Sequence, residues 1–236
     1  MPNIHILAED VRNKIAAGEV IERPASVVKE LVENAIDAGA DNIIVAIENG
    51  GKDLIRVIDN GCGMNADDAM LAFERHSTSK IKRVEDIIHI SSLGFRGEAL
   101  PSIASVSKLH LVTRTAEEEM ATIVEYANGK LINVTKTAAN TGTAVTVRGL
   151  FKDLPARRKF LKTAQVEARH ILKYIHYQAL VYPQISFRLV IEDKEKLNYI
   201  ACAERKQRIE EVFGGGFFED DIIPIEGKYS DYSISG

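Results

Sequence analysis

The clearest hydrophobic pattern in the chain lies between residues 24 and 38. Apolar residues recur there with helical spacing and cover one side, and the opposite side carries Glu30, Glu33, Asn34 and Asp37. Pro24 suits the first turn of a helix because its missing N–H costs nothing there, and Gly39 suits the turn that ends it. The pattern therefore predicts a helix over residues 24–38 with three carboxylates and an amide in one row. Taken alone, such a row is most often a solvated helix face.

Alternating β-branched residues predict strands separated by polar turns. A hairpin is expected over 42–48 and 54–58, and further strands over 109–114, 121–126, 131–135, 143–148, 185–192 and 197–201. Helical spacing recurs over 65–75 and 157–180, where Phe160 and Ile171 are among the expected core positions. Helix signals followed by a run of hairpin strands favour an α+β two-layer sandwich, with a mostly antiparallel sheet and helices on one face, over a parallel βαβ sheet.

Composition and charge narrow the class of protein. With 236 residues and 45% hydrophobic composition the chain can bury a real core. A net charge of -4 argues against a generally cationic nucleic-acid binder, so any DNA contact must come from a local patch. Cys62 and Cys202 form no CxxC pair, which fits a reducing compartment, and no signal peptide or long apolar span is present. We expect a soluble cytoplasmic protein without membrane partners.

Two glycine-containing motifs carry candidate chemistry. The strand over 54–58 runs into Asp59-Asn60-Gly61-Cys62-Gly63-Met64, where glycines permit positive φ and close approach of a flat ligand. A plain hairpin turn would explain this motif if it stood alone. The second motif, Leu93 to Leu100, contains Gly94-Phe95-Arg96-Gly97 and leads into a predicted helix, whose first N–H groups suit phosphate oxygens. No Walker P-loop occurs, so a nucleotide must bind in another way.

The polar helix and these two motifs, in this order, resemble the nucleotide site of the GHKL ATPases. Residues 14–40, together with Arg75-His76-Ser77-Thr78-Ser79-Lys80-Ile81, resemble in particular the MutL family of DNA mismatch repair proteins. The resemblance covers nearly the whole chain. It implies the GHKL (Bergerat) type of α/β sandwich and the cofactors ATP and Mg²⁺.

The resemblance also assigns roles to individual residues. Glu30 becomes the general base that activates water, and the amide oxygen of Asn34 becomes a Mg²⁺ ligand. Asp59 accepts a hydrogen bond from the adenine N6 amine, which guanine lacks; Thr143 supports that contact and Gly63 lets the purine lie against the backbone. The expected nucleotide-binding residues are Asn34, Asp37, Asp59, Gly63, Met64, Thr78, Ser79, Lys80, Gly94, Phe95, Arg96, Gly97, Leu100 and Thr143. Thr78, Ser79 and Lys80 match the family's lid over the phosphates.

The stretch from Lys152 to Lys173 is rich in basic residues. Two interpretations stay open, a solvated helix face or contacts to the DNA backbone through Arg157, Arg158, Lys159 and Lys162. The resemblance further implies a slow ATPase switch: ATP closes the lid, orders the N-terminal arm and drives homodimer formation, and the partners are mismatch-recognition and downstream repair proteins.

The expected domains are a nucleotide-binding domain over residues 1–203 and the beginning of a truncated second α/β domain over 204–236. The alternatives are another GHKL ATPase, such as a topoisomerase ATPase subunit or a sensor kinase, and a non-catalytic DNA-binding module.

Overall fold

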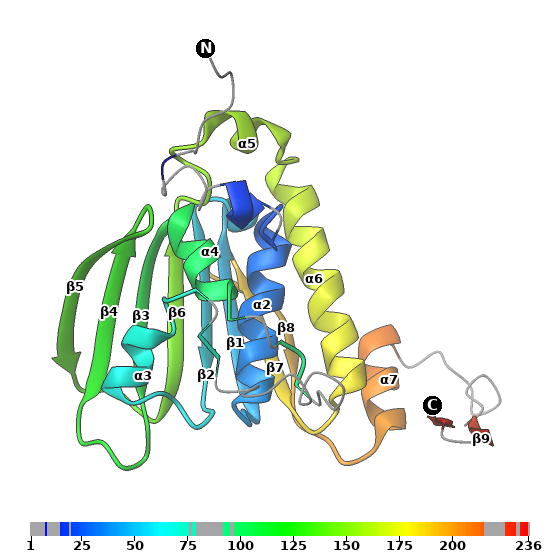
Figure 1. Ribbon diagram of the computed structural model, residues 1–236. Coiled ribbons are helices and arrows are strands. Elements are labelled where there is room, and N and C mark those ends of the chain that lie inside the picture. The colour runs from blue at the N-terminus through cyan, green and yellow to red at the C-terminus, as the bar shows by residue number, and fades with distance from the viewer. Residues whose placement is uncertain are drawn as a thin grey trace.

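One mixed sheet forms the back of the molecule, and helices cover one of its faces (Figure 1). The computed structural model describes residues 8, 15–18, 20–75, 77–78, 92–94, 97–214, 225–229 and 232–235. The sheet has eight strands in the order β5-β4-β3-β6-β2-β1-β7-β8. Its strands are β1 (Asn42–Glu48), β2 (Leu54–Asp59), β3 (Lys108–Arg114), β4 (Ala121–Ala127), β5 (Lys130–Thr137), β6 (Gly142–Arg148), β7 (Ser186–Ile191) and β8 (Lys194–Tyr199).

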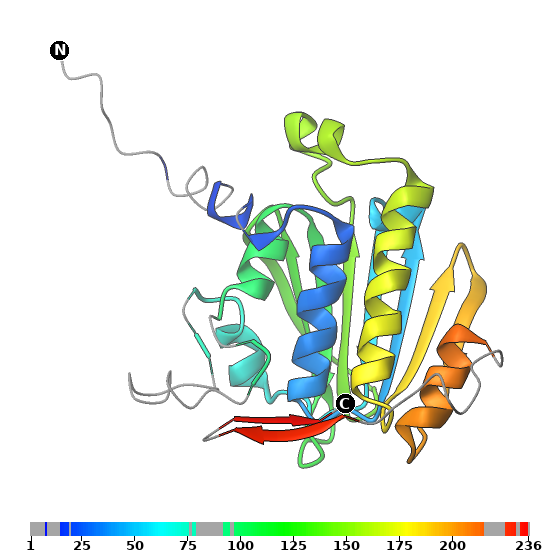
Figure 2. The ribbon, with the colours of Figure 1, turned by 90° about the vertical axis from the view of Figure 1, so that its right-hand side faces the viewer.

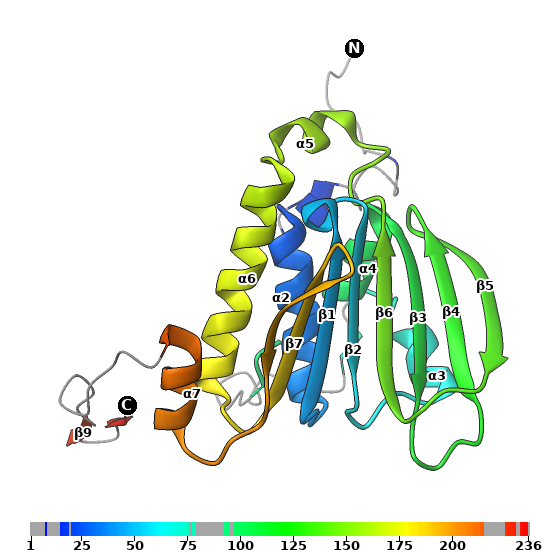
Figure 3. The ribbon, with the colours of Figure 1, turned by 180° about the vertical axis from the view of Figure 1, so that it is seen from behind.

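Every neighbouring pair in this sheet is antiparallel except β1 and β7. Strand β1 shows the alternation that makes the sheet two-sided, because Ile43, Val45 and Ile47 are buried while the residues between them are half-buried. Figure 3 shows the other face of the sheet, which no described helix covers. The predicted α+β sandwich is therefore confirmed.

Two long helices, α2 (Pro24–Asp37) and α6 (Ala164–Val181), lie side by side on the covered face (Figure 2). The first has Pro24 in its opening turn, as predicted, and Gly39 after it has a φ of 73°. Its buried residues are Pro24, Val27, Val28, Leu31, Val32 and Ala35. Burial of this apolar stripe fixes the rotation of α2, so its polar row does not face the core.

The predicted helix over 157–180 is wrong, because the structure has two helices there. Helix α5 (Pro155–Phe160) ends where Leu161 adopts an extended conformation with ψ of 138°. The side chain of Thr163 then accepts from Val166 N and caps the start of α6, while Glu167 Oε1 accepts from Lys162 N at 2.8 Å. Phe160 was expected in the core but is 83% exposed, whereas Ile171 is fully buried as expected.

The remaining elements are short. They are η1 (Asn49–Gly51), α3 (Ala66–Leu71), α4 (Ala99–Ser105), α7 (Arg205–Phe213), β9 (Glu226–Tyr229) and β10 (Tyr232–Ser235). Helix α3 is shorter than the predicted 65–75, and Asn65 caps it by accepting from Asp68 N at 2.8 Å.

Helix α7 packs on α6 and is held by the fully buried Arg208. The Nη2 of this arginine donates to the carbonyls of Pro183 and Ile200, and its Nε lies 3.4 Å from Glu211 Oε2. Whether residues 204–236 begin a second domain is not tested by these contacts and stays a prediction.

Candidate functional site

A cavity of about 1070 Å³ opens between α2, the ends of β2 and β6, and the segments that precede α3 and α4. This volume is large enough for a nucleotide, since pockets for small molecules measure roughly 300–1,000 Å³. The predicted site residues that line it are Glu30, Asn34, Asp37, Asp59, Gly63, Met64, Thr78, Gly94, Gly97, Leu100 and Thr143. Four other predicted residues, Ser79, Lys80, Phe95 and Arg96, lie outside the described residues.

The polar row of α2 forms one wall of this cavity. Glu30, Glu33, Asn34 and Asp37 all line it, and the Glu33 side chain is only 13% exposed. On the neighbouring helix the hydroxyl of Tyr174 donates to the Lys29 carbonyl at 3.4 Å. Burial raises the pKa of Tyr174 above its ordinary value, and the negative charges of Glu33 and Glu30 raise it further. The α2 wall is therefore an acidic surface that faces a cavity rather than a flat solvated face.

Asp37, at the end of this row, fixes the loop that precedes α4. Its Oδ1 accepts from Leu93 N at 3.0 Å, and its Oδ2 accepts from Gly94 N at 3.2 Å. Asp37 is one of the residues that the sequence predicts to bind the nucleotide. In the structure the Asp37 carboxylate also holds the Gly94 backbone at the rim of the cavity.

Asp59 ends β2 with its side chain at the cavity. Its Oδ1 accepts from Gly61 N at 2.9 Å and from Thr143 N at 3.2 Å. Burial raises the pKa of the Asp59 carboxyl, although these two N–H donors act in the opposite direction. Among the described residues Oδ2 has no hydrogen-bond partner, so the side chain retains an oxygen that can accept a hydrogen bond from a ligand.

The loop after Asp59 packs backbone against backbone, which requires glycine. Gly63 has a φ of 70°, and a Cβ on it would lie 2.0 Å from the Arg114 carbonyl oxygen. Gly97 has a φ of 61°, and its Cβ would lie 2.3 Å from the Ser77 carbonyl oxygen. Both glycines therefore allow loops from distant parts of the sequence to meet at the cavity.

Sequence reasoning missed Thr113, which connects two sides of this site. The side chain is 1% exposed, and its Oγ1 lies 2.9 Å from Met64 N and 3.0 Å from Thr143 Oγ1. Threonine is common in strands because it is β-branched, so its presence at position 113 did not indicate this contact.

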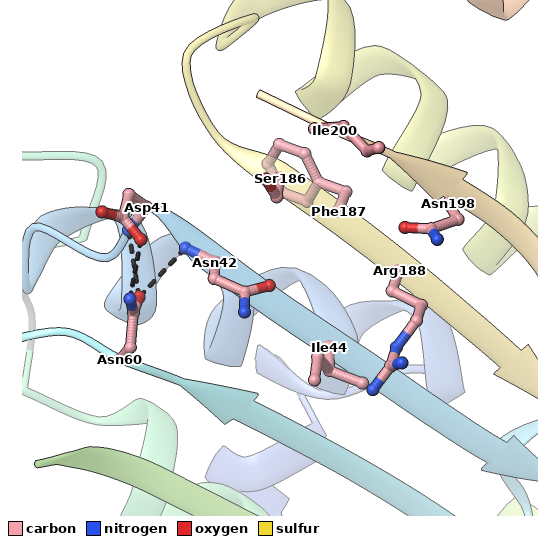
Figure 4. Close-up of a pocket in the computed structure, with 9 residues that line it drawn as sticks. All are labelled: Asp41, Asn42, Ile44, Asn60, Ser186, Phe187, Arg188, Asn198 and Ile200. Atoms are coloured by element: carbon pink, nitrogen blue, oxygen red, sulfur yellow. Dashed lines mark hydrogen bonds between the residues drawn. The ribbon is translucent and has the colours of Figure 1, made fainter. Parts of the chain in front are cut away.

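Asn60 of the same motif lies on the uncovered side of the sheet, beside a separate hollow of about 440 Å³ (Figure 4). Its Oδ1 accepts from Asp41 N at 3.1 Å and from Asn42 N at 3.0 Å, and its Nδ2 donates to Asp41 Oδ1 at 2.6 Å. These bonds tie the start of β1 to the end of β2, so Asn60 has a structural role.

The predicted DNA-binding residues lie on and after α5, at the end of the molecule where α2 begins (Figure 1). Arg158 Nη2 is 3.2 Å from Asp53 Oδ1. Arg157 Nη2 donates to the Ile15 carbonyl at 3.4 Å, and its guanidinium lies 5.8 Å from the centre of the Phe151 ring. The side chains of Lys159 and Lys162 are exposed. Two of the four residues are thus engaged within the protein.

No preformed metal centre and no membrane span occur in the described residues. They contain no group of three or more His, Cys, Asp or Glu side chains placed to hold a metal ion. Their helices are also too short or too polar to cross a bilayer.

Comparisons with known proteins identify the family to which this chain is similar. Residues 21–147 match the family of histidine kinase-, DNA gyrase B-, and HSP90-like ATPases. The chain is 52% identical over 225 residues to the DNA mismatch repair protein MutL of Solibacter usitatus, an alignment that covers 95% of this chain and 34% of that protein. It is 48% identical over 236 residues to MutL of Opitutus terrae, covering 100% of this chain and 37% of that protein.

A solved structure gives the same likeness. The Aquifex aeolicus MutL ATPase domain, complexed with ADP, is 37% identical to this chain with a TM-score of 0.68, and the match covers 88% of this chain and 72% of that one. The chain spans about a third of the length of the curated relatives that it matches.

Proposed function

Because the chain belongs to the MutL family of DNA mismatch repair proteins and carries a GHKL-type ATPase fold, we propose that it binds and slowly hydrolyses Mg²⁺-ATP in the cavity beside α2. One observation carries the proposal: Glu30 and Asn34 from the polar row of α2 and Asp59 from the glycine-containing motif after β2 line a single cavity. In this role the protein is a nucleotide-driven switch of mismatch repair.

The nucleotide is recognised at one end of the cavity and reacts at the other. Asp59 accepts a hydrogen bond from the N6 amine of adenine, which a guanine would replace by a carbonyl oxygen. Gly97 lies at the phosphate end, where backbone N–H groups stabilise negative charge, and the Asp37 carboxylate, which accepts from Gly94 N, fixes the loop that precedes it. Glu30 takes a proton from the water that attacks the terminal phosphate, because its side chain lies in the lining of the cavity that holds the phosphates.

The residues present fit a Mg²⁺ ion that arrives with its nucleotide. Asn34 offers a hard amide oxygen on the wall that also carries Glu30, and phosphate oxygens and waters complete the coordination of Mg²⁺ in most such sites. Mg²⁺ would offset the charge of the phosphates during their transfer.

Two substitutions on α2 separate binding from hydrolysis. Glu30→Ala should leave the affinity for a non-hydrolysable ATP analogue nearly unchanged and remove turnover, because a general base acts in the transition state. Asn34→Ala should also lose the Mg²⁺-dependent part of binding. Glu48→Gln, at the end of β1 and outside the cavity, is the matched control and should behave like the wild type. Equal losses of affinity in the two α2 variants would contradict the assignment.

DNA contact through the surface on and after α5 is the second part of the proposal. Its support is the pair of exposed lysines, Lys159 and Lys162, close in sequence to Arg158. Replacing both lysines by glutamine should weaken binding to all DNA sequences alike and should flatten the slope of log K against log salt by roughly one unit per lost contact. Lys194 and Lys196, exposed on β8, provide the control pair. If the slope of log K against log salt does not change, the lysines belong to a solvated helix face and do not contact DNA.

ATP-driven lid closure and dimerisation complete the proposed switch. Family membership supports them, together with the position of Thr78 at the cavity. Sedimentation should detect a homodimer with the non-hydrolysable analogue and a monomer with ADP. The same comparison in the presence of mismatch-recognition or downstream repair proteins should show nucleotide-dependent association. Sedimentation that is identical with both nucleotides would refute the switch.

A further inference from the structure

Thr113 places a buried hydroxyl beside Met64 and Thr143, two of the residues that line the cavity. In the sheet it pairs with Thr143 on β6, and its side chain is 1% exposed. Its Oγ1 lies 2.9 Å from Met64 N, 3.2 Å from the Gly142 carbonyl oxygen and 3.0 Å from Thr143 Oγ1. One hydroxyl thus joins the loop after β2, the start of β6 and the side chain of Thr143.

The number of protons limits how these contacts can be made. A threonine hydroxyl has one proton and two lone pairs, and Met64 N–H occupies one lone pair of Thr113. The Thr113 proton can go either to Gly142 O or to Thr143 Oγ1. In the first arrangement Thr143 donates its own proton to Thr113 and offers the cavity only lone pairs. In the second, Thr143 accepts from Thr113 and keeps its proton for a ligand.

The second arrangement matches adenine. The adenine edge has the N6 amine, a donor, next to N1, an acceptor. Asp59 can accept from the amine, and Thr143 N already donates to Asp59 Oδ1, so the Thr143 hydroxyl is adjacent. A group beside Asp59 that donates to N1, directly or through water, therefore completes the match.

We infer that Thr113 is a positioning residue for adenine recognition: it donates to Thr143 Oγ1 and so leaves the Thr143 proton available to N1 of the purine. This inference rests on the proposed function, in which the cavity holds an adenine nucleotide. A purely structural role, in which Thr113 only anchors the loop through Met64 N, makes a different prediction for ligands that lack N1.

The test compares ADP with 1-deaza-ADP, which keeps the N6 amine and replaces N1 by a C–H group. Equilibrium titration of the wild type should show a preference for ADP of about tenfold, the size of one ordinary hydrogen bond. Thr113→Val keeps the shape of the side chain but removes the hydroxyl, so the preference should disappear whatever happens to the overall affinity. Thr113→Ser should retain the preference, and Thr143→Val should lose it in the same way as Thr113→Val.

The possible outcomes are distinct. A Thr113→Val variant that binds both ligands more weakly, but with the wild-type preference, overturns the inference and leaves Thr113 a structural role. If Thr113→Val does not fold, Thr113→Ala, which also lacks a hydroxyl, replaces it, and an unchanged preference in that variant likewise overturns the inference. A wild type that binds ADP without preferring it over 1-deaza-ADP overturns the inference alone, whereas a wild type that binds no ADP overturns the proposed function as well.

Discussion

Alanine at Gly63 should destabilise the protein more than alanine at Gly39, although the two glycines have nearly equal, positive φ angles. Their φ angles are 70° and 73°. A residue with a Cβ costs roughly 1–2 kcal/mol in this left-handed region. Beyond that strain the sites differ, because a Cβ at Gly39 would meet nothing within 4 Å, whereas one at Gly63 would lie 2.0 Å from the Arg114 carbonyl oxygen and 2.6 Å from its carbon.

The clash at Gly63 cannot be relieved by a rotating side chain. Non-bonded atoms prefer separations of about 3.5–4 Å, so the loop must move by more than an ångström away from β3. Overpacking of this kind typically costs about 1–3 kcal/mol. Gly39→Ala should therefore lose about 1–2 kcal/mol of unfolding free energy and Gly63→Ala about 2–5 kcal/mol. The gain from a less flexible unfolded chain is common to both variants and cancels in the comparison.

Urea denaturation at a constant m-value measures both losses. Gly63 also lines the cavity, whereas Gly39 does not, so nucleotide affinity should fall in Gly63→Ala and stay near the wild-type value in Gly39→Ala. Equal free energies of unfolding in the two variants would refute the close packing of this loop against Arg114.

Three further predictions test other parts of the structure. Because burial raises the pKa of Asp59 above its ordinary value of 3.8, adenine-nucleotide affinity should fall as the pH is lowered through that raised pKa, at a higher pH than an ordinary carboxyl would require; titrations across pH should find no such fall in Asp59→Asn. Arg208→Met should lower the unfolding free energy by about 1–3 kcal/mol per carbonyl left unpaired, whereas the exposed Arg205→Ala on the same helix should change it by less than about 0.5 kcal/mol, as measured by urea denaturation. Thr163→Ala should cost about 0.5–2 kcal/mol by removing the cap of α6, and Thr163→Ser should retain it; equal melting of the two variants would contradict the capping role.

The parts of the site that could be predicted from the sequence depend on local periodicity. Helical spacing alone put Glu30, Asn34 and Asp37 on one face, and the burial of Val28 and Val32 on the other side fixed which face meets the cavity. A strand that runs into a glycine-rich motif likewise placed Asp59 and Gly63 at a strand end. Both arguments use residues that are close in sequence, where chain geometry leaves few alternatives.

The break between α5 and α6 was missed because hydrophobic spacing continues across it. Phe160 and Leu161 fit a helix pattern that extends to Ile171, but Thr163 and Glu167 satisfy backbone N–H groups at a new helix start. In the sequence this pattern is a threonine with a glutamate four residues later. The hydrogen bonds of these two side chains favour a new helix start at α6 more strongly than the hydrophobic spacing favours one continuous helix.

Other features depend on partners far away in the chain, which no local pattern encodes. Thr113 meets Met64, and Arg208 meets carbonyls of Pro183 and Ile200. Charged helix residues such as Arg208 and Arg157 are expected at the surface, yet Arg208 is fully buried and Arg157 donates to Ile15. Their roles follow from the tertiary fold alone.

Competitive titration with non-hydrolysable ATP and GTP analogues in the presence of Mg²⁺ tests the central claim most directly. The account predicts saturable binding at one site per chain with a preference for the ATP analogue. In Asp59→Asn, whose amide can present either a donor or an acceptor, that preference should weaken by about 1–3 kcal/mol. The absence of saturable binding, or an unchanged preference in Asp59→Asn, would contradict the assignment of the cavity beside α2 as an adenine-nucleotide site.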